Sequence, residues 1–464
     1  MPGNRLEFMQ RMTRAMGKVN TRLQRDLTRR TRIQRRYSLK EVAAFISIDY
    51  DYLVSLIGKD GFPSGERLGR ERVLSIDEML QVRAMLAARP QTTKDYLPWR
   101  SPLDPLPVLT VSGQKGGTGK SSVAAHLAQY LCLAHGLRVG LIDSDPQATL
   151  SLYFADNSLQ LFDPDLETVA DFMGVEDPTR GAVAKRTPEE LNAFWKETPW
   201  PGIRLIPGGP SINEGDIALF MVAKSDPASV YKSLYRSLRR WSDGYRPRTS
   251  AADFVVGGEF SVERWRAGLR ETFDVIVIDQ QPSLTLMQLN GIIAADTLIL
   301  PQTMKGFDLS TLTTYVTAAY GFLRHIAEVD EDLVIGSGRD VIVPSIVQTS
   351  NAQDYRQIQD LMEQAPGDIL SVWYERSDAV ANASEVYQSI YEFQPGKNTR
   401  KSAKRFMANA NAVNDAIVAR ALPHLESRGF AEAFMAEKWE EDSPDEAEDD
   451  EARPGQSVGG ARVA

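Results

Sequence analysis

Short runs of apolar residues alternate with helical stretches from residue 107 onward and dominate the pattern of this chain. Each run is nearly continuous in apolar character, which is typical of strands buried on both faces. The seven runs are VLTVSG, RVGLID, IRLIPG, FDVIVID, DTLILPQ, VIVPSIV and ILSVWY. This alternation predicts an α/β fold with a doubly wound, mostly parallel sheet, and with longer polar insertions at 151–200 and 240–268.

The start of the chain follows a helical period instead. Apolar residues recur at spacings of three and four between arginines, and this stripe comprises Met9, Met12, Met16, Val19, Leu23 and Leu27. We therefore expect residues 1–36 to form a basic helix. Its apolar stripe could dimerise, lie on a membrane or dock on its own domain, and its methionine-rich character favours a dimerisation arm over a membrane-binding surface.

Residues 37–90 are expected to form an all-α winged helix-turn-helix domain. Three helix starts are predicted by capping residues: Ser38 with Glu41, Asp49, and Ser75 with Glu78. Gly65 and Gly69 flank charged residues that suit a wing. The residues expected to contact DNA are Tyr52 and Ser55 at bases, and Arg67, Arg70 and Arg72 at phosphates. The alternative is a small helical domain that binds no ligand.

Composition excludes several classes of protein. The chain has 464 residues, of which 42% are hydrophobic and 25% charged, as in ordinary soluble proteins. It has no run of about 18 apolar residues, so we expect no membrane span. Its one cysteine, Cys132, lies in a helical pattern, and we expect it to be buried there. A single cysteine also excludes a disulfide framework. The expected location is cytoplasmic.

Charge is distributed unevenly along the chain, although the net charge is only −9. Residues 1–40 carry twelve Lys or Arg and two acids, whereas residues 437–452 carry ten acids and one lysine. The basic arm predicts a polyanionic partner. The acidic end has no apolar periodicity, so we expect a disordered tail that is solvating or self-screening.

The stretch VSGQKGGTGKSS follows the first run and opens a helix, which is the context of a phosphate-binding loop. Glycine N–H groups would surround phosphate oxygens at the helix N-terminus. Lys120 would reach the β- and γ-phosphates, and Ser121 would bind Mg²⁺. The expected nucleotide-binding residues are Gln114, Lys115, Gly116, Gly117, Thr118, Gly119, Lys120, Ser121 and Ser122.

This loop departs from the usual pattern of glycine, four residues, then Gly-Lys-Ser/Thr. Gln114 replaces the first glycine, and a second lysine, Lys115, follows it. A lysine at the start of the loop points away from its own phosphates. Its reach suits the γ-phosphate bound by a second subunit, so we predict that Lys115 is catalytic in trans within a homodimer.

Three aspartates at or after the ends of apolar runs complete the predicted site. Asp143 ends RVGLID and Asp279 ends FDVIVID, where carboxylates could hold Mg²⁺ together with Ser121. Asp145 could orient the attacking water and is the second predicted catalytic residue. The expected cofactors are ATP and Mg²⁺.

These segments resemble the ParA/MinD family of deviant Walker ATPases, and read closest to the RepA partition proteins of plasmids and secondary replicons. The matching stretches are QKGGTGKSS, LIDSDPQATLS, VIVIDQQPSL and LILPQTMKGFDLSTL. The resemblance covers much of residues 37–420, although Gln281 stands where the family often has proline. It implies a sandwich dimer with bound ATP, weak ATP hydrolysis stimulated by DNA, nucleoid association, and a centromere-binding ParB-type partner.

The resemblance also implies non-specific DNA contacts near the end of the ATPase domain. The basic residues there are Lys397, Arg400, Lys401, Lys404 and Arg405. A solvated helix face is the alternative for this cluster. The expected parts of the chain are a basic helix at 1–36, a winged helix-turn-helix domain at 37–90, a linker at 91–106, the ATPase domain at 107–435 and the acidic tail at 436–464.

Other functions within this resemblance fit the sequence less well. A nitrogenase-type iron protein needs two cysteines per subunit, and this chain has one. A MinD-like membrane ATPase needs an amphipathic C-terminal helix, whereas the acidic end of this chain would be repelled by anionic lipid. The serious alternative is a site-specific repressor that uses nucleotide only as an allosteric ligand. The helix-turn-helix is compatible with both functions, including a partition ATPase that represses its own operon.

Overall fold

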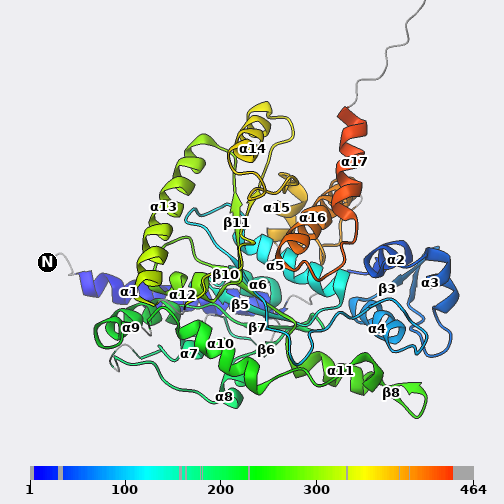
Figure 1. Ribbon diagram of the computed structural model, residues 1–464, viewed down its shortest axis with the longest axis horizontal. Coiled ribbons are helices and arrows are strands. Elements are labelled where there is room, and N and C mark those ends of the chain that lie inside the picture. Colours follow the sequence, from blue (N-terminus) through cyan, green and yellow to red (C-terminus); the bar gives the residue numbers. More distant parts are fainter. Residues whose placement is uncertain are drawn as a thin grey trace, which may run out of the picture.

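The computed structural model describes most of the chain, from Arg5 to Asp442. The described residues are 5–29, 35–155, 159–161, 163, 165–177, 179, 181–227, 230–330, 333–385, 387–396 and 398–442. Figure 1 shows a central sheet with helices on both sides, and with the first small domain at one end.

The central sheet has the strand order β12-β11-β4-β10-β5-β7-β6. Its strands are β4 (Val108–Val111), β5 (Val139–Ser144), β6 (Lys196–Glu197), β7 (Ile203–Ile206), β10 (Val275–Gln280), β11 (Thr297–Gln302) and β12 (Val341–Pro344). Every neighbouring pair is parallel except the antiparallel edge pair of β6 and β7. The predicted mostly parallel α/β fold is confirmed.

Alternating residues of the inner strands pack against different helices, which makes the sheet doubly wound. Leu141 and Val277 belong to the hydrophobic cluster that includes α5 (Lys120–Tyr130) and α16 (Arg400–Ala421). Ile142 and Ile278 belong to a second cluster on the opposite face. That cluster includes residues of α7 (Val169–Met173), α9 (Ser211–Ser225), α10 (Ser233–Gly244) and α12 (Leu286–Ala294). Burial on both faces explains why these strands read as continuous apolar runs.

Further elements lie outside the sheet and the helices already named. They are η1 (Leu131–His135), α6 (Thr149–Phe154), α8 (Pro188–Ala193), η2 (Ala251–Phe254), β8 (Val255–Val256), β9 (Glu259–Phe260), α11 (Val262–Glu271), α13 (Gly306–Val329), α14 (Ala352–Gln364), α15 (Asp378–Glu385) and α17 (Phe430–Asp442). The insertions predicted at 151–200 and 240–268 therefore contain short helices and a small hairpin. Cys132 is buried in the π-helical turn η1, as predicted, and burial raises the pKa of its thiol to about 12.

Six of the seven predicted strands form, and the seventh prediction is wrong. The run ILSVWY, residues 369–374, follows β12 without a regular ladder: the only bridges nearby join Ile342 to Ile369 and Val347 to Glu375. Its apolar residues are buried all the same, since Val372 and Tyr374 pack in the first core cluster. Apolar character alone therefore did not distinguish a buried irregular segment from a strand. The antiparallel strand β6 was not predicted.

The segment predicted to be a winged helix-turn-helix domain begins with β1 (Tyr37–Ser38), α2 (Leu39–Ile46) and α3 (Tyr50–Leu56). It continues with β2 (Glu66–Leu68), β3 (Glu71–Leu74) and α4 (Ile76–Ala87). All three predicted caps form, with reciprocal hydrogen bonds at Ser38–Glu41 and Ser75–Glu78. The description of this domain as all-α needs correction, because β1, β3 and β2 form a three-stranded antiparallel sheet. The strands are too short for a period-2 pattern to be visible in the sequence.

One buried arginine joins this domain to the α/β core. The Arg83 guanidinium donates to the carbonyl oxygens of Phe45 in α2 and of Leu133 and Ala134 in η1, at 2.8, 2.8 and 2.9 Å. Burial lowers the pKa of Arg83 to about 9. Arg83 is thus a cation shared by two helix C-termini, that of α2 and that of η1, which continues α5.

We expect Arg83→Ala to lower the free energy of unfolding by about 3 kcal/mol, because it leaves several buried carbonyl groups without a donor. Urea unfolding at equilibrium measures the change. Arg266→Ala is the matched control, since Arg266 joins the same domain through an exposed ion pair with Asp77, and we expect it to cost less than about 1 kcal/mol. Equal effects of the two changes would contradict the structural role of Arg83.

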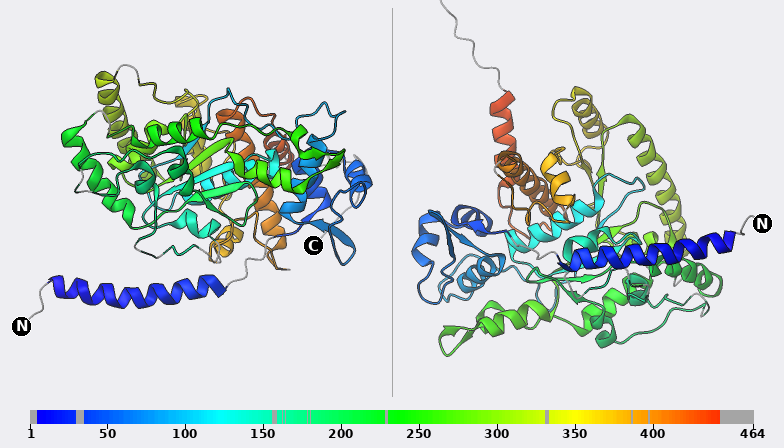
Figure 2. Two further views of the ribbon diagram at one scale, coloured as in Figure 1. Left: turned by 90° about the horizontal axis from the view of Figure 1, so that it is seen from below. Right: turned by 180° about the vertical axis from the view of Figure 1, so that it is seen from behind.

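Helix α1 (Arg5–Arg29) lies along the outside of the molecule (Figure 2). Its stripe residues Met9, Met12, Met16 and Val19 are exposed, and they cover no part of the described core. The role of this stripe in self-association stays a prediction. No helix of the described residues is long and apolar enough to cross a membrane.

Candidate nucleotide-binding site

The phosphate-binding loop leaves β4 after Val111 and ends at the N-terminus of α5. Gly113, Gly117 and Gly119 have φ angles of 140°, 79° and 88°, which residues with a side chain rarely adopt. A Cβ atom added at Gly117 or Gly119 would meet no atom within 4 Å. The loop therefore presents its backbone to open space, as binding of an anion through N–H groups requires.

The side chain of Lys120 crosses this loop. It is buried, and its Nζ donates to the carbonyl oxygen of Lys115 at 2.9 Å. Burial lowers the pKa of Lys120, whereas Asp279 and Asp145 raise it. Lys120 is thus a cation held inside the loop with two carboxylates near it.

The second lysine of the loop has a partner that the sequence analysis did not identify. Lys115 forms an ion pair with Asp308 in the first turn of α13. Thr303, directly after β11, donates a hydrogen bond to the other oxygen of Asp308. The Lys115 side chain is therefore tied to the segment that follows β11, and its ammonium is not bonded to a group of its own loop.

Two buried aspartates lie side by side at the C-terminal ends of neighbouring strands. Asp279 on β10 is in register with Asp143 on β5 and with Val111 on β4. Oδ2 of Asp143 accepts hydrogen bonds from the backbone N and the hydroxyl of Ser151, at 2.8 and 2.6 Å. Burial raises the pKa of Asp143 to about 7, with a further increase from Asp145, while the Ser151 hydrogen bonds lower it.

Asp279 fits a role near a divalent cation better than Asp143 does. Among the described residues, no group makes a hydrogen bond of ordinary geometry to either of its oxygens. Burial and the neighbouring Asp143 raise its pKa well above the usual value, whereas Ser121 and Lys120 lower it. A buried carboxylate that accepts no hydrogen bond of ordinary geometry from the described residues, next to a loop hydroxyl, suits Mg²⁺ held directly by Ser121 and through water by Asp279. Asp143 instead uses both oxygens within its own loop.

Asp145 lies in the tight turn after β5. Its Oδ1 accepts a hydrogen bond from the backbone N of Gln147 at 2.8 Å, and Ala148 has a left-handed φ of 54°. The turn also needs Gly208, because a Cβ there would lie 2.7 Å from Cγ of Asp143 and 2.6 Å from the carbonyl oxygen of Asp145. The carboxylate of Asp145 is therefore held in a rigid loop beside Lys120.

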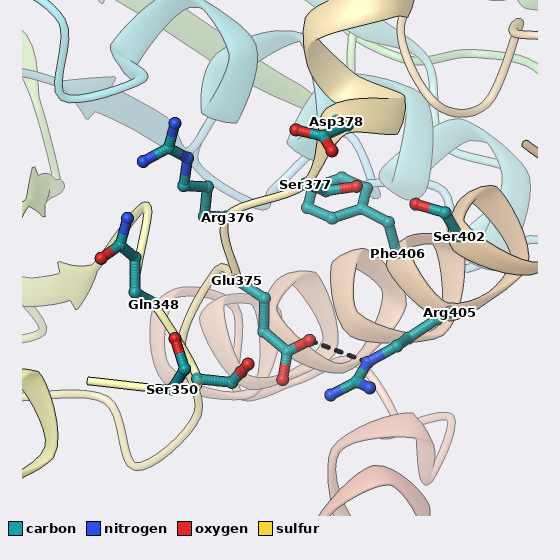
Figure 3. Close-up of a pocket in the computed structure, with 10 residues that line it drawn as sticks. Gln348, Ser350, Glu375, Arg376, Ser377, Asp378, Ser402, Arg405 and Phe406 are labelled. Atoms are coloured by element: carbon teal, nitrogen blue, oxygen red, sulfur yellow. Dashed lines mark hydrogen bonds and ion pairs between the residues drawn. The ribbon is translucent and has the colours of Figure 1, made fainter. Parts of the chain in front are cut away.

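Beyond the loop, a polar cavity of about 400 Å³ opens between the segment after β12, the segment before α15 and the start of α16 (Figure 3). It is lined by Gln348, Thr349, Ser350, Glu375, Arg376, Ser377, Asp378, Ser402, Arg405 and Phe406. Ser345, at the end of β12, donates to the carbonyl oxygen of Thr118 at 2.9 Å and so connects this side of the cavity to the loop. The volume is sufficient for a nucleoside.

The glutamine that replaces the expected proline has partners of its own. Gln281 Nε2 donates to the hydroxyl of Thr285 at 3.1 Å, and its carbonyl oxygen accepts from Gln288 at 3.2 Å. Gln288 also donates to Ser112, which precedes the phosphate-binding loop. Hydrogen bonds therefore connect the segment after Asp279 to the loop without the rigidity of a proline.

The structure brings the predicted loop residues and the three aspartates together at the C-terminal ends of the inner strands β4, β10 and β5. Gln114 is exposed, Thr118 is buried, and the hydroxyl of Ser122 lies 3.4 Å from that of Tyr153. Sequence reasoning missed Asp308 and the cavity. Asp308 lies in the first turn of α13, beyond the end of β11, so the rule that found Asp143 and Asp279, an acid at the end of an apolar run, does not indicate it.

The predicted DNA-binding residues of the small domain lie on two elements. Tyr52 and Ser55 are exposed on α3, opposite its buried Leu53 and Leu56. Arg67 is paired with Arg72 across the two strands of the wing, and Arg70 is exposed at its tip. The structure thus places the predicted base-contacting residues on one exposed helix and the predicted phosphate-contacting arginines on one hairpin, and their contact with DNA stays a prediction.

The second basic cluster lies mainly on α16. Arg400, Lys401 and Lys404 are exposed on its first turns. Arg405 forms an ion pair with Glu375 at 3.2 Å and lines the cavity. Lys397 lies outside the described residues.

The parallel sheet, the glycine loop at a helix N-terminus and the two strand-end aspartates define a P-loop nucleotide-binding protein. A family comparison agrees with this class: the model of the CobQ/CobB/MinD/ParA nucleotide-binding domain matches residues 109–416. The chain belongs to this family, and the resemblance inferred from its motifs is confirmed.

Individual relatives cover most of the chain at low identity. "Putative replication protein A" of Sinorhizobium fredii is 26% identical over 83% of this chain and 86% of its own length. Protein SopA of Escherichia coli K12 is 26% identical over 64% of this chain and 66% of its own. A solved structure described as "Partition Protein" superposes with a TM-score of 0.51 at 19% identity, over 85% of this chain and 94% of that one.

Proposed function

We propose that this protein is a DNA-partition ATPase. It would bind ATP and Mg²⁺, dimerise on ATP, bind DNA non-specifically, and segregate a plasmid or secondary replicon together with a centromere-binding ParB-type protein. The names of the relatives support the class, since they include protein SopA and a chromosome partitioning protein ParA.

The observation that carries this proposal is the pair of lysines in one phosphate-binding loop, with different partners. Lys120 is buried inside the loop and suits phosphates bound by its own chain. The ammonium of Lys115 has no bond to its own loop and pairs with Asp308. A lysine in this position is free to exchange a carboxylate for the γ-phosphate of a facing subunit, which supports a homodimer with shared sites.

Mg²⁺ would neutralise phosphate charge next to Ser121 and Asp279. The residues of the chain do the rest: loop N–H groups and Lys120 bind phosphates, and Asp145 orients the attacking water. Lys115 of the facing subunit would stabilise charge on the γ-phosphate. Hydrolysis would thus depend on dimerisation, and we expect it to be weak unless DNA and the partner protein stimulate it.

DNA binding would use two separate surfaces. The helix-turn-helix suits an operator, because exposed side chains of α3 can reach base edges while the wing arginines contact phosphates. The α16 cluster suits DNA of any sequence, because its residues offer charge without a shape that reads bases. Bound ATP would then place the protein on the nucleoid.

We expect the two surfaces to separate experimentally. Replacing Arg400, Lys401 and Lys404 with glutamine should weaken ATP-dependent binding to random duplexes and reduce the salt slope by roughly one unit per lost phosphate contact. Deleting residues 1–90 should remove operator binding and leave part of the random-DNA binding. Salt-titrated binding to both duplexes, with ATP and with ADP, measures this.

A matched control for the triple variant is Arg239→Gln, Arg246→Gln and Arg248→Gln, which removes three exposed arginines of α10 and the residues after it. If the α16 variant keeps full ATP-dependent affinity for random DNA, its cluster is only a solvated face.

A second function is supported by the Arg83 contact between the helix-turn-helix and η1. In a repressor that uses nucleotide only as an allosteric ligand, this contact would transmit the nucleotide state from α5 to α2. ATP turnover with and without DNA separates the two functions. A pure repressor binds nucleotide but shows no hydrolysis that DNA stimulates.

A further inference from the structure

Three cations at the start of α16 form no ion pair with the acidic residues that the structure describes. Arg400, Lys401 and Lys404 are exposed, and within the described part of the chain none of them forms an ion pair. Their spacing of three and four residues places Lys404 on the same helix face as the other two. The next cation, Arg405, differs because Glu375 already pairs with it. This face is therefore an uncompensated positive surface.

The opposite charge is concentrated directly after α17. Residues 445–451 contain six acids: Asp445, Glu446, Glu448, Asp449, Asp450 and Glu451. They lie outside the described residues, and they follow Asp442, the last residue of α17. The most acidic stretch of the chain thus begins at the end of a described helix.

Helix α17 packs on α16, which fixes where this acidic stretch starts. The backbone N atoms of Arg428 and Phe430 donate to the carboxylate of Asp415 on α16, both at 3.0 Å. About 16 Å of helix separates Asp415 from Lys404, and about 18 Å separates Phe430 from Asp442. The gap between Lys404 and Asp442 is therefore shorter than about 45 Å, helix diameters included, and is smallest if the helices run antiparallel.

The acidic residues bridge this gap where it is no more than about 30 Å, as when α17 runs antiparallel to the start of α16. Nine extended residues from Asp442 to Glu451 cover about 30 Å. A segment tethered at this range has an effective local concentration in the millimolar range, so even weak ion pairs are populated. Ion pairs of this kind weaken as salt rises.

We propose that residues 445–451 dock on Arg400, Lys401 and Lys404 and compete with DNA for this surface. The proposal rests on the DNA-binding role of α16 proposed above. DNA must then displace the acidic segment before its phosphates reach the helix. DNA binding then releases fewer counterions than it would from a surface without the acidic segment, because the carboxylates already replace part of the ions around the three cations.

Zero-length carbodiimide cross-linking of the full chain tests docking without DNA. We expect amide bonds from Lys401 and Lys404 to residues 445–451, identified by mass spectrometry at low salt and lost at about 0.5 M salt, where the Debye length is only a few ångströms. Lys224 on α9 is exposed and serves as the control lysine. Cross-links that are no more frequent at Lys401 and Lys404 than at Lys224, or that form mainly with Lys18 of α1, would overturn the proposal.

DNA binding provides the functional arm. Changing the six acids to Asn or Gln should tighten binding to a random duplex about tenfold at 50 mM salt and should steepen the salt slope. The same change in the Arg400→Gln, Lys401→Gln, Lys404→Gln background should have little effect, because the docking surface is gone.

The possible outcomes separate the two proposals. Equal tightening in both backgrounds means that the acids repel DNA in a general way, and it contradicts docking. If the specific cross-links form but the triple variant binds random DNA normally, docking holds and the DNA-binding role of α16 fails.

Discussion

Replacing Lys120 with alanine is expected to abolish nucleotide binding, with a loss of at least about 100-fold in affinity. Lys120 is the cation inside the loop, and its ammonium is already placed by the carbonyl oxygen of Lys115 at 2.9 Å. Without it, several phosphate charges would enter a site that contains Asp145 and Asp279 and no compensating lysine. Equilibrium binding of a fluorescent ATP analogue measures the loss.

The matched control is Lys115→Ala, at the other lysine of the same loop. We expect this variant to keep much of its affinity for nucleotide, because Lys115 pairs with Asp308 and not with a group of its own loop. Circular dichroism checks that both variants fold. Binding by Lys120→Ala that equals that of the unmodified chain would contradict the assignment of the phosphate site.

Asp145→Ala is expected to lose hydrolysis by about 10²- to 10⁴-fold while it still binds ATP and dimerises. The change removes the group that orients water and leaves the phosphate contacts in place. It also removes a negative charge close to Lys120, which should not weaken binding of an anion. Turnover of ATP and sedimentation in excess ATP measure the two properties.

A dimer of Asp145→Ala that persists after ATP is added is the expected result. Asp145→Asn is the matched control for size, and it should behave in the same way because an amide is a poor base. A variant that stays monomeric in excess ATP contradicts the role of Asp145, since it would mean that the carboxylate shapes the loop instead of acting on water.

The sheet and the loop could be predicted because each is encoded locally. A strand buried on both faces needs a continuous apolar run, and a left-handed backbone near a phosphate needs glycine at 113, 117 and 119. The caps of α2, α3 and α4 follow from single side chains for the same reason. The strand prediction at 369–374 was wrong because the apolar residues there indicate burial and do not indicate pairing in a sheet.

The rest of the site depends on contacts between distant segments. The ion pair of Lys115 and Asp308 joins residues that are 193 positions apart, and Arg83 joins the small domain to η1 across 50 positions. No local pattern encodes either contact. The distinction between Asp143 and Asp279 also needed the structure, because both are acids at strand ends and the hydrogen bonds that Ser151 and Asp145 donate to Asp143 set them apart.

Sedimentation of the purified chain with ATP and Mg²⁺, and with ADP and Mg²⁺, tests the central claim most directly, which is that two lysines in one loop couple nucleotide to dimerisation. We predict a dimer with ATP and a monomer with ADP. Lys115→Gln should stay monomeric with either nucleotide, and Asp308→Asn should still dimerise on ATP because Lys115 is retained. A Lys115→Gln variant that dimerises on ATP as the unmodified chain does would falsify the account.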